Sequence, residues 1–294
     1  MSFLLKKLIF VFLLLFFNFK LFAGVFKSEN FIVFYKQINK KYIERFIKFL
    51  EKDVDDFQRK IGKYPENRVK IIIAGNDEEY LKILHPNQKI IEFSQAAYIK
   101  NNNTIIIRNP KNIIDYNSIH QIVLHEYIHS FVNYYFYNPP LWFNEGMAVY
   151  YSGDFTLDRE LRFVYSYILR NSLSLKEMVS AYPKNRSEWE FFYAKSALAI
   201  KYLSTTDKNK FIYFWDRAKK KSNFYKIFRL TYIKSINSFY IEFEKYCKTH
   251  FKIMILTASS SILWGVMPFL VIIIYARKKI KYKNLYKKEV DNNE

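Results

Sequence analysis

The feature that most constrains this chain is the stretch of residues 124–153, which reads LHEYIHSFVNYYFYNPPLWFNEGMAVYYSG. His125 and His129 lie four positions apart in it, and Glu126 directly follows the first histidine. On a helix, positions i and i+4 are about 40° apart around the axis and separated by about 6 Å of rise, so both imidazoles can reach one metal ion. The run Asn138-Pro139-Pro140 stops the helix, because the residue before a proline is disfavoured in the helical conformation. We expect the chain to reverse there and to lay a second helix beside the first.

A catalytic zinc site takes three protein ligands and keeps one coordination position open. The third ligand is expected to be a carboxylate, because the single cysteine, Cys247, has no reason to lie close and His250 lies beyond the last predicted soluble helix. Glu145 comes 16 positions after His129, past the proline turn. We therefore predict that His125, His129 and Glu145 bind one Zn²⁺ ion per chain.

Glu126 points to the side of this predicted metal site rather than at the ion. There it can act as a general base and take a proton from a water molecule whose pKa zinc lowers to roughly 7. His120 lies about 140° around the helix from His125, so it is expected to face away from the metal as a surface or core histidine.

Apolar patterns before this stretch predict strands and helices in alternation. Residues 31–35 and 68–75 read as buried strands, and each is followed by a helical pattern. Gly62 is expected to end the first helix and Asn76 to cap the second. Residues 96–108 read as a hairpin with Asn101–Asn103 as its turn.

The remaining soluble part of the chain is predominantly helical in pattern. Ser118 has capping-box spacing and is expected to begin the long helix that runs to about Tyr137. The helical pattern resumes at Asn144, with a second capping box at Ser187, and the last soluble helix is expected from Ser235 to about His250. Because strands come first and helices later, we predict an α+β fold: a small mixed sheet with an edge hairpin, an active-site helix and a helical C-terminal half.

Both ends of the chain carry apolar segments of membrane type. Residues 1–23 combine a basic start, a short apolar run and a final alanine, a pattern typical of a signal peptide or, if uncleaved, an N-terminal anchor. Ile253 to Tyr275 is a 23-residue stretch without a charge, and the basic residues of 276–294 follow at once. That length spans a bilayer as a helix, and the basic flank marks the cytoplasmic side. The sequence thus predicts a single-pass membrane protein with residues 24–252 outside the cytoplasm and a cytoplasmic C-terminal tail.

The formal charge of +20 is weak support for a polyanionic partner. The chain is rich in Ile, Lys, Asn, Phe and Tyr, a skew that raises the lysine count everywhere, and ten of the basic residues flank the predicted membrane segments. A nucleic-acid-binding function is the alternative that the charge suggests, and the predicted exported topology argues against it. The single cysteine excludes an intramolecular disulfide framework and a thiolate zinc site, and it is expected to be a small buried apolar residue.

The sequence LHEYIHSFVNYY followed by PPLWFNEGMAVYYSG resembles the active-site segment of the gluzincin zinc metallopeptidases, the thermolysin-like clan, and within it most closely the peptidase MA-like proteins. The segments ENFIVFY, FFYAKSALAIKYL and FYKIFRLTYIKSINSFYIEFEKYCK, together with the hairpin before the zinc helix, are also similar in order, over roughly residues 29–250. The resemblance implies His125, His129 and Glu145 as zinc ligands and Glu126 as base and proton shuttle.

The same resemblance implies that residues 104–108 form the edge strand along which an extended peptide pairs. It also implies a phenol or imidazole that stabilises the oxyanion, for which Tyr193 is the candidate. Thermolysin-type enzymes place an acid one turn after the third ligand to orient a zinc histidine. Here Val149 occupies that position, so a backbone carbonyl or Asp154 is expected to substitute.

The function that these patterns favour is a membrane-anchored zinc metallopeptidase that hydrolyses peptide bonds of a peptide or protein substrate. The alternative is a catalytically inactive metallopeptidase-like module for binding or assembly at the membrane. The absent acid at Val149 motivates this alternative. No nucleic-acid partner is predicted.

Overall fold

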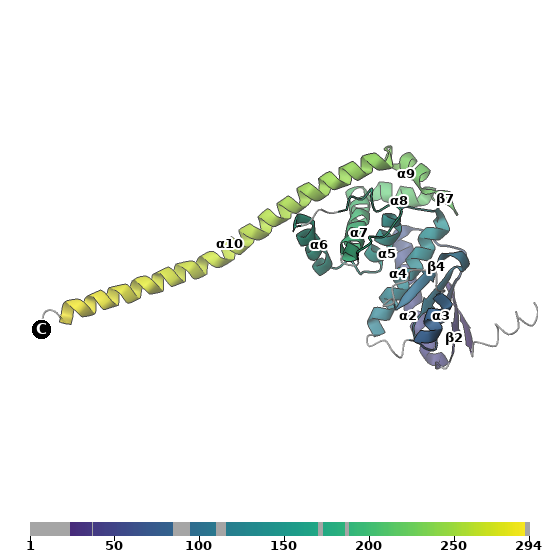
Figure 1. Ribbon diagram of the computed structural model, residues 1–294, viewed down its shortest axis with the longest axis horizontal. Coiled ribbons are helices and arrows are strands. Elements are labelled where there is room, and N and C mark those ends of the chain that lie inside the picture. The colour runs from purple at the N-terminus through teal and green to yellow at the C-terminus, as the bar shows by residue number, and fades with distance from the viewer. Residues whose placement is uncertain are drawn as a thin grey trace, which may run out of the picture. The chain divides into compact units, whose positions relative to one another are not determined.

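A computed structural model of the chain describes residues 24–36, 38–84, 95–109, 116–169, 173–185 and 188–291 (Figure 1). Two compact units are present, Met1–Tyr240 and Ile241–Glu294. The first unit holds a mixed sheet followed by helices, so the predicted α+β class with a mixed sheet is confirmed.

The sheet has five strands in the order β1-β2-β3-β5-β4. The three central strands, β2, β3 and β5, run parallel, whereas β1 and β4 pair antiparallel at the two edges. The strands are β1 Gly24–Lys27, β2 Phe31–Tyr35, β3 Val69–Ile73, β4 Ala96–Ile99 and β5 Thr104–Ile107. The predicted hairpin is therefore confirmed, but the assignment of 104–108 to the edge is wrong. Residues 104–107 pair on both sides, with β3 and with β4, so the open edge belongs to Ala96–Ile99.

Helices cover both faces of this sheet (Figure 1). Helix α2, Lys40–Ile61, begins at Asn39, whose side chain accepts a hydrogen bond from the Lys41 N–H, and ends at Gly62 in the left-handed conformation with φ 75°. Helix α3, Asp77–Leu84, packs Tyr80 and Leu84 against Ile106 on the other face, and Asn76 caps it as predicted. Both caps satisfy backbone groups that helix termini leave without partners.

Helix α4, Tyr116–Tyr135, carries the His-Glu-x-x-His motif and differs from its predicted bounds at both ends. It begins two residues before Ser118, and residues 136–137 form strand β6, Phe136–Tyr137, which pairs parallel with β7, Ser222–Asn223. Helical hydrogen bonding stops there because the Tyr134 carbonyl accepts from the backbone N–H of Lys221.

Helix α5, Leu141–Tyr151, follows the prolines and packs against α7, Trp189–Thr206. The two helices approach so closely that a Cβ atom on Gly146 would lie 2.3 Å from the Ser196 carbonyl oxygen. Only glycine fits at this crossing, which fixes the position of Glu145 one residue earlier.

The helical C-terminal half is confirmed by α6 Leu157–Leu169, α8 Lys208–Arg217, α9 Phe224–Tyr232 and α10 Ile236–Asp291. Ser235 caps α10 as predicted, because its hydroxyl accepts from the Ser238 N–H, but this helix continues well past His250. Cys247 is buried, as expected. Ser187 and the predicted signal peptide, residues 1–23, lie outside the described residues.

The prediction of a C-terminal transmembrane helix is wrong. In the part of the chain that the structure describes, no helix is long and apolar enough to cross a membrane. The stretch 253–275 belongs to the continuous helix α10. The predicted single-pass topology, extracytoplasmic catalytic domain and cytoplasmic tail depend on that span and are withdrawn with it.

Candidate metal centre

Helices α4 and α5 bring the three predicted ligands together. The Nε2 atoms of His125 and His129 lie 3.2 Å apart, and Glu145 Oε2 lies 3.9 Å from the first and 3.5 Å from the second. Tetrahedral zinc with bonds near 2.1 Å places its ligand atoms about 3.4 Å from one another. One ligand atom from each residue therefore matches the spacing of a zinc site, and this group could hold a metal ion.

Glu145 is held in place by a residue that the sequence patterns did not indicate. Glu145 is 3% exposed, and its Oε1 accepts a hydrogen bond from the Tyr182 hydroxyl. Both imidazoles face the other oxygen, Oε2, so the tyrosine orients the carboxylate toward them. Burial and the Glu145 carboxylate raise the pKa of Tyr182 far above its usual value, which keeps the phenol protonated as a donor.

Tyr182 itself is 43% exposed, although its hydroxyl reaches the buried carboxylate. It lies in the segment between α6 and α7, in a chain with 25 tyrosines, and no helical or strand pattern marks it. Only the tertiary fold brings this segment back across α5, so no sequence signal could have identified it.

The carboxylate of Glu126 lies at the open edge of the sheet. The backbone N–H of Tyr98 in β4 donates a 2.7 Å hydrogen bond to its Oε2. Burial raises the pKa of Glu126 to about 7, and the nearby Glu145 carboxylate adds to the rise, while His129 and the Tyr98 N–H oppose it. A carboxyl group with a pKa near neutrality can both accept and release a proton.

The imidazole of His125 is kept neutral by its surroundings. Burial lowers its pKa well below the usual value, and the charges of His129 and Arg159 act in the same direction. Neutral imidazole is the form that ligates metals.

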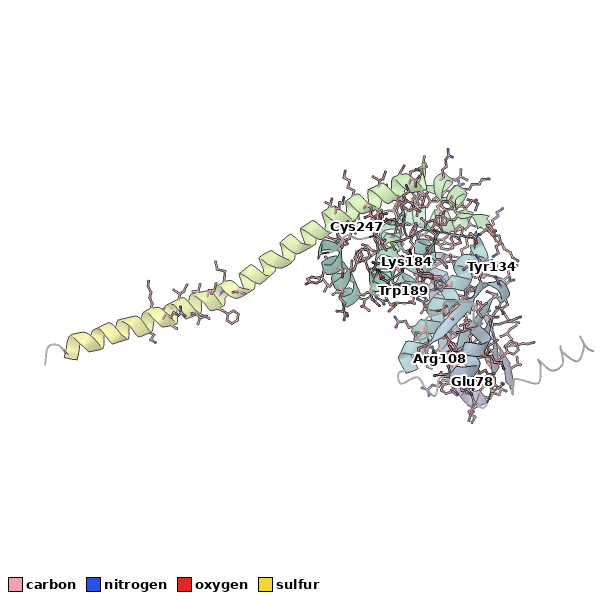
Figure 2. The ribbon with its side chains drawn as sticks, in the orientation of Figure 1. Glu78, Arg108, Tyr134, Lys184, Trp189 and Cys247 are labelled. Atoms are coloured by element: carbon pink, nitrogen blue, oxygen red, sulfur yellow. The ribbon has the colours of Figure 1, made fainter. Side chains whose placement is uncertain are left out.

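A cavity of about 810 Å³ opens over the three predicted ligands and Glu126. Its wall includes Tyr193, whose hydroxyl makes no hydrogen bond to a described residue, and Trp189, which begins α7 (Figure 2). Burial, followed by the Glu145 and Glu126 carboxylates, raises the pKa of Tyr193 above its usual value. The phenol is thus a protonated donor in the same cavity as the metal ligands.

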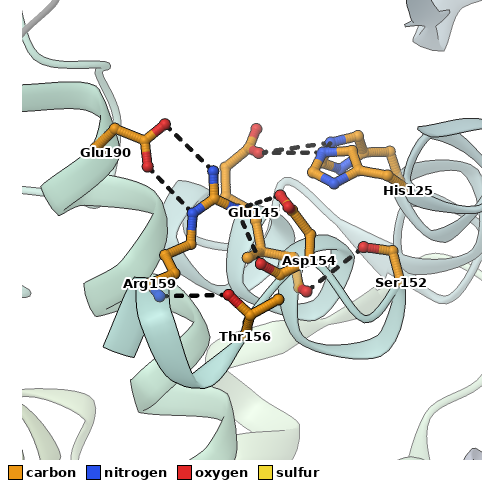
Figure 3. A network of polar contacts seen from close by, with 9 residues as sticks. His125, Glu145, Ser152, Asp154, Thr156, Arg159 and Glu190 are labelled. Atoms are coloured by element: carbon orange, nitrogen blue, oxygen red, sulfur yellow. Dashed lines mark hydrogen bonds and ion pairs between the residues drawn. The ribbon is translucent and has the colours of Figure 1, made fainter. Parts of the chain in front are cut away.

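The expected substitute for the absent acid is not at the histidines. Asp154 forms an ion pair with Arg159, whose guanidinium also binds the Glu190 carboxylate at 3.1 and 3.2 Å (Figure 3). Among the described residues, His129 Nδ1 is buried without a hydrogen-bond partner. The prediction of Asp154 as an orienting group is therefore wrong, because its carboxylate is already paired, and no described backbone carbonyl takes that role for His129.

His120 is remote from the metal ligands, as predicted. Its ring packs against Phe46 and Phe49, with centroids 4.9 and 5.9 Å away, and its Nδ1 lies 3.8 Å from Asp53 Oδ2. It belongs to the interface between α2 and α4.

The hairpin turn is fastened to the metal helix beside His129. Asn103, left-handed with φ 51°, accepts hydrogen bonds at its Oδ1 from the Tyr98 hydroxyl, at 3.0 Å, and from the Ser130 hydroxyl, at 2.7 Å. This contact ties β4 to α4 and so sets the distance between the open strand edge and the metal ligands.

No protein-family model matches this chain, and no curated protein matches it either. The fold and the site define the chain as an α+β protein with a buried His₂Glu cluster that could hold a metal ion.

Proposed function

We propose that this protein is a zinc-dependent peptidase of the gluzincin type, with one Zn²⁺ ion held by His125, His129 and Glu145. The observation that carries the proposal is that the ligand atoms of His125, His129 and Glu145 lie within 4.8 Å of one another. Glu126 lies on α4, the same helix as the two histidines. The His-Glu-x-x-His motif followed by a glutamate on the next helix is the arrangement of that class.

The chain's own residues divide the work of hydrolysis. Zinc, when bound, would polarise the scissile carbonyl and lower the pKa of a water molecule. Glu126 takes a proton from the attacking water while the water oxygen bonds to the carbonyl carbon. It then gives that proton to the amide nitrogen as the C–N bond breaks. Tyr193 donates a hydrogen bond to the carbonyl oxygen as negative charge develops on it, a contribution expected to be about 10²-fold or more in rate.

The open edge of β4 favours a peptide substrate. Ala96, Ala97 and Tyr98 line the cavity, and the Tyr98 N–H already faces the site through its hydrogen bond to Glu126. An extended peptide can pair its backbone with such an edge, and the two small side chains leave room for it. The proposed substrate is therefore a peptide or an unfolded protein segment.

The test is the substitution Glu126→Gln in the purified full-length chain. Peptide-library hydrolysis by the wild type should require zinc, stop with chelator and fall by at least about 10³-fold in the variant, while one zinc ion per chain remains bound. Glu44→Gln, which alters an exposed carboxylate on α2, is the matched control and should retain full activity. Undiminished hydrolysis by Glu126→Gln would refute the mechanism.

A second candidate is a non-catalytic relative that binds the metal without hydrolysing peptides. The unpartnered His129 Nδ1 favours it, because orienting partners of metal histidines commonly raise affinity and activity by 10–100-fold. Zinc bound at one ion per chain, lost in His129→Ala, combined with no hydrolysis of any library peptide, would support this candidate over the enzyme.

A further inference from the structure

A second, smaller cavity lies next to the metal cavity. Its volume is about 120 Å³, and Tyr98, Lys100 and Asn133 line both cavities. It extends past the C-terminal end of α4, where Tyr134 marks its position (Figure 2), to Lys220 and Lys221 in the segment before β7. The two cavities are therefore neighbours that share part of their walls.

Three lysines surround the second cavity, and none of them forms an ion pair with an acidic residue in the part of the chain that the structure describes. Lys100 Nζ donates to Asn138 Oδ1 at 2.8 Å, Lys221 Nζ donates to the Asn133 carbonyl at 2.8 Å, and Lys220 Nζ lies 5.6 Å from the Tyr134 ring centroid. Among the described residues that line the cavity none is Asp or Glu. Burial and the neighbouring Lys221 ammonium lower the pKa of Lys100, as expected for cations that gather without a counter-ion.

The fold keeps these lysines together at a conformational cost. Lys221 has φ 58°, a left-handed conformation that residues other than glycine rarely adopt. Its N–H and Nζ bind the last carbonyls of α4, Tyr134 and Asn133, where a cation is favoured by the helix dipole. Lys221 therefore has a structural role, and the ammonium groups of Lys100 and Lys220 are the ones that remain to bind a ligand.

Strand β4 leads from the metal centre to this cavity. Tyr98 contacts Glu126 through its backbone, and Lys100 follows two residues later. A strand advances about 3.3 Å per residue, so a peptide paired with β4 would place a group two or three residues from the scissile bond near Lys100.

Resting on the proposed peptidase function, we propose that the cavity bounded by Lys100, Lys220 and Lys221 binds a carboxylate group of the substrate. The carboxylate belongs either to an Asp or Glu side chain near the scissile bond or to the C terminus of the peptide. Ammonium groups donate charge-assisted hydrogen bonds to such a group, which a neutral amide of the same shape cannot match.

The test measures binding, so that it does not depend on hydrolysis. The zinc-loaded full-length Glu126→Gln variant is titrated by calorimetry with capped alanine heptapeptides that carry one Glu or one Gln at each position in turn. A second arm compares the uncapped C-terminal carboxylate of the same heptapeptide with its amide. We expect at least one Glu peptide, or the free acid, to bind about tenfold more tightly than its neutral partner.

The same titration in Lys100→Gln/Lys220→Gln, made in the Glu126→Gln background, should reduce the ratio to about one, because the acidic peptide loses more affinity than its neutral partner. Lys208→Gln/Lys226→Gln removes the same net charge from exposed sites on α8 and α9 and should keep the preference. Equal affinities for all charged and neutral pairs, or no measurable binding of any peptide, would overturn the carboxylate site. If the wild type hydrolyses no peptide but the preference for the carboxylate peptide is observed, the peptidase function is refuted and the carboxylate-binding site is still supported.

Discussion

The substitution Gly146→Ala probes the contact that positions Glu145, the proposed third metal ligand. The added Cβ would lie 2.3 Å from the carbonyl oxygen of Ser196, 2.7 Å from its carbonyl carbon and 2.8 Å from the side chain of Ile200. Ordinary contacts for a Cβ begin above about 3.4 Å, so α5 and α7 must separate locally by about 1 Å. The clash involves helix backbone, which cannot rotate away as a side chain can.

The expected cost is about 3 kcal/mol, the upper end of the range for overpacking a well-packed core. For a folded unit of this size, about 1 kcal/mol shifts the melting temperature by roughly 2–4 °C, so the variant should melt about 6–12 °C lower. Because Glu145 is the preceding residue, the same displacement moves its carboxylate off the imidazoles. Zinc affinity should fall by about tenfold or more, since ligand geometry tolerates only about 0.5 Å.

Differential scanning calorimetry of the metal-free chain measures the first effect, and competition with a zinc chelator measures the second. Gly75→Ala is the control, because its Cβ would meet only the movable end of the Glu79 side chain, at 2.9 Å. A melting temperature and zinc affinity of Gly146→Ala equal to those of Gly75→Ala would refute the close packing of α5 against α7 and its role in placing Glu145.

Four further predictions follow from individual contacts. Tyr182→Phe removes the hydrogen bond to Glu145 and should weaken zinc binding by about 10–100-fold in chelator competition. Tyr193→Phe should instead lower kcat and leave the zinc affinity unchanged. The reverse pattern would mean that Tyr193 orients the metal ligand and Tyr182 stabilises the oxyanion. Asn103→Ala loses three side-chain hydrogen bonds, two accepted from Tyr98 and Ser130 and one donated to the Arg68 carbonyl, and it loses a favourable left-handed residue. Urea unfolding should therefore show a loss of about 2–3 kcal/mol, and an unchanged midpoint would contradict the tie between the hairpin and helix α4. Adding zinc should raise the melting temperature of the wild type and not that of His129→Ala, because only a folded site binds the ion. Burial lowers the pKa of His120, so below about pH 6.5 its imidazole binds a proton more readily in the unfolded chain than in the folded chain. The folded state is therefore destabilised as the pH falls through this range, whereas above it His120 causes no such loss. His120→Gln should show a smaller difference in unfolding free energy between about pH 5 and pH 7, measured by urea unfolding, than the wild type.

The local features of the fold were predictable from the sequence because they arise from residues close together in the chain. The i and i+4 spacing of His125 and His129 needs only a helix, and the caps at Gly62 and Asn76 use contacts within a few residues. The reversal at the prolines was enough to suggest Glu145 as the third ligand. The extent of α10 was not predictable in the same way, because an apolar stretch indicates a buried or membrane environment without defining which.

By itself the sequence determined the alternation of strands and helices and the hairpin of residues 96–108, and it singled out His125, His129 and Glu145, which the fold brings together. Only the tertiary structure decided which strand of that hairpin is the open edge, because either strand could have paired with β3. It also brought Tyr182 onto Glu145, paired Asp154 with Arg159 rather than with a histidine, and gathered Lys100 with Lys220 across more than a hundred residues. These arrangements depend on contacts between segments far apart in the chain, and the energies of such contacts cannot be predicted from local sequence patterns.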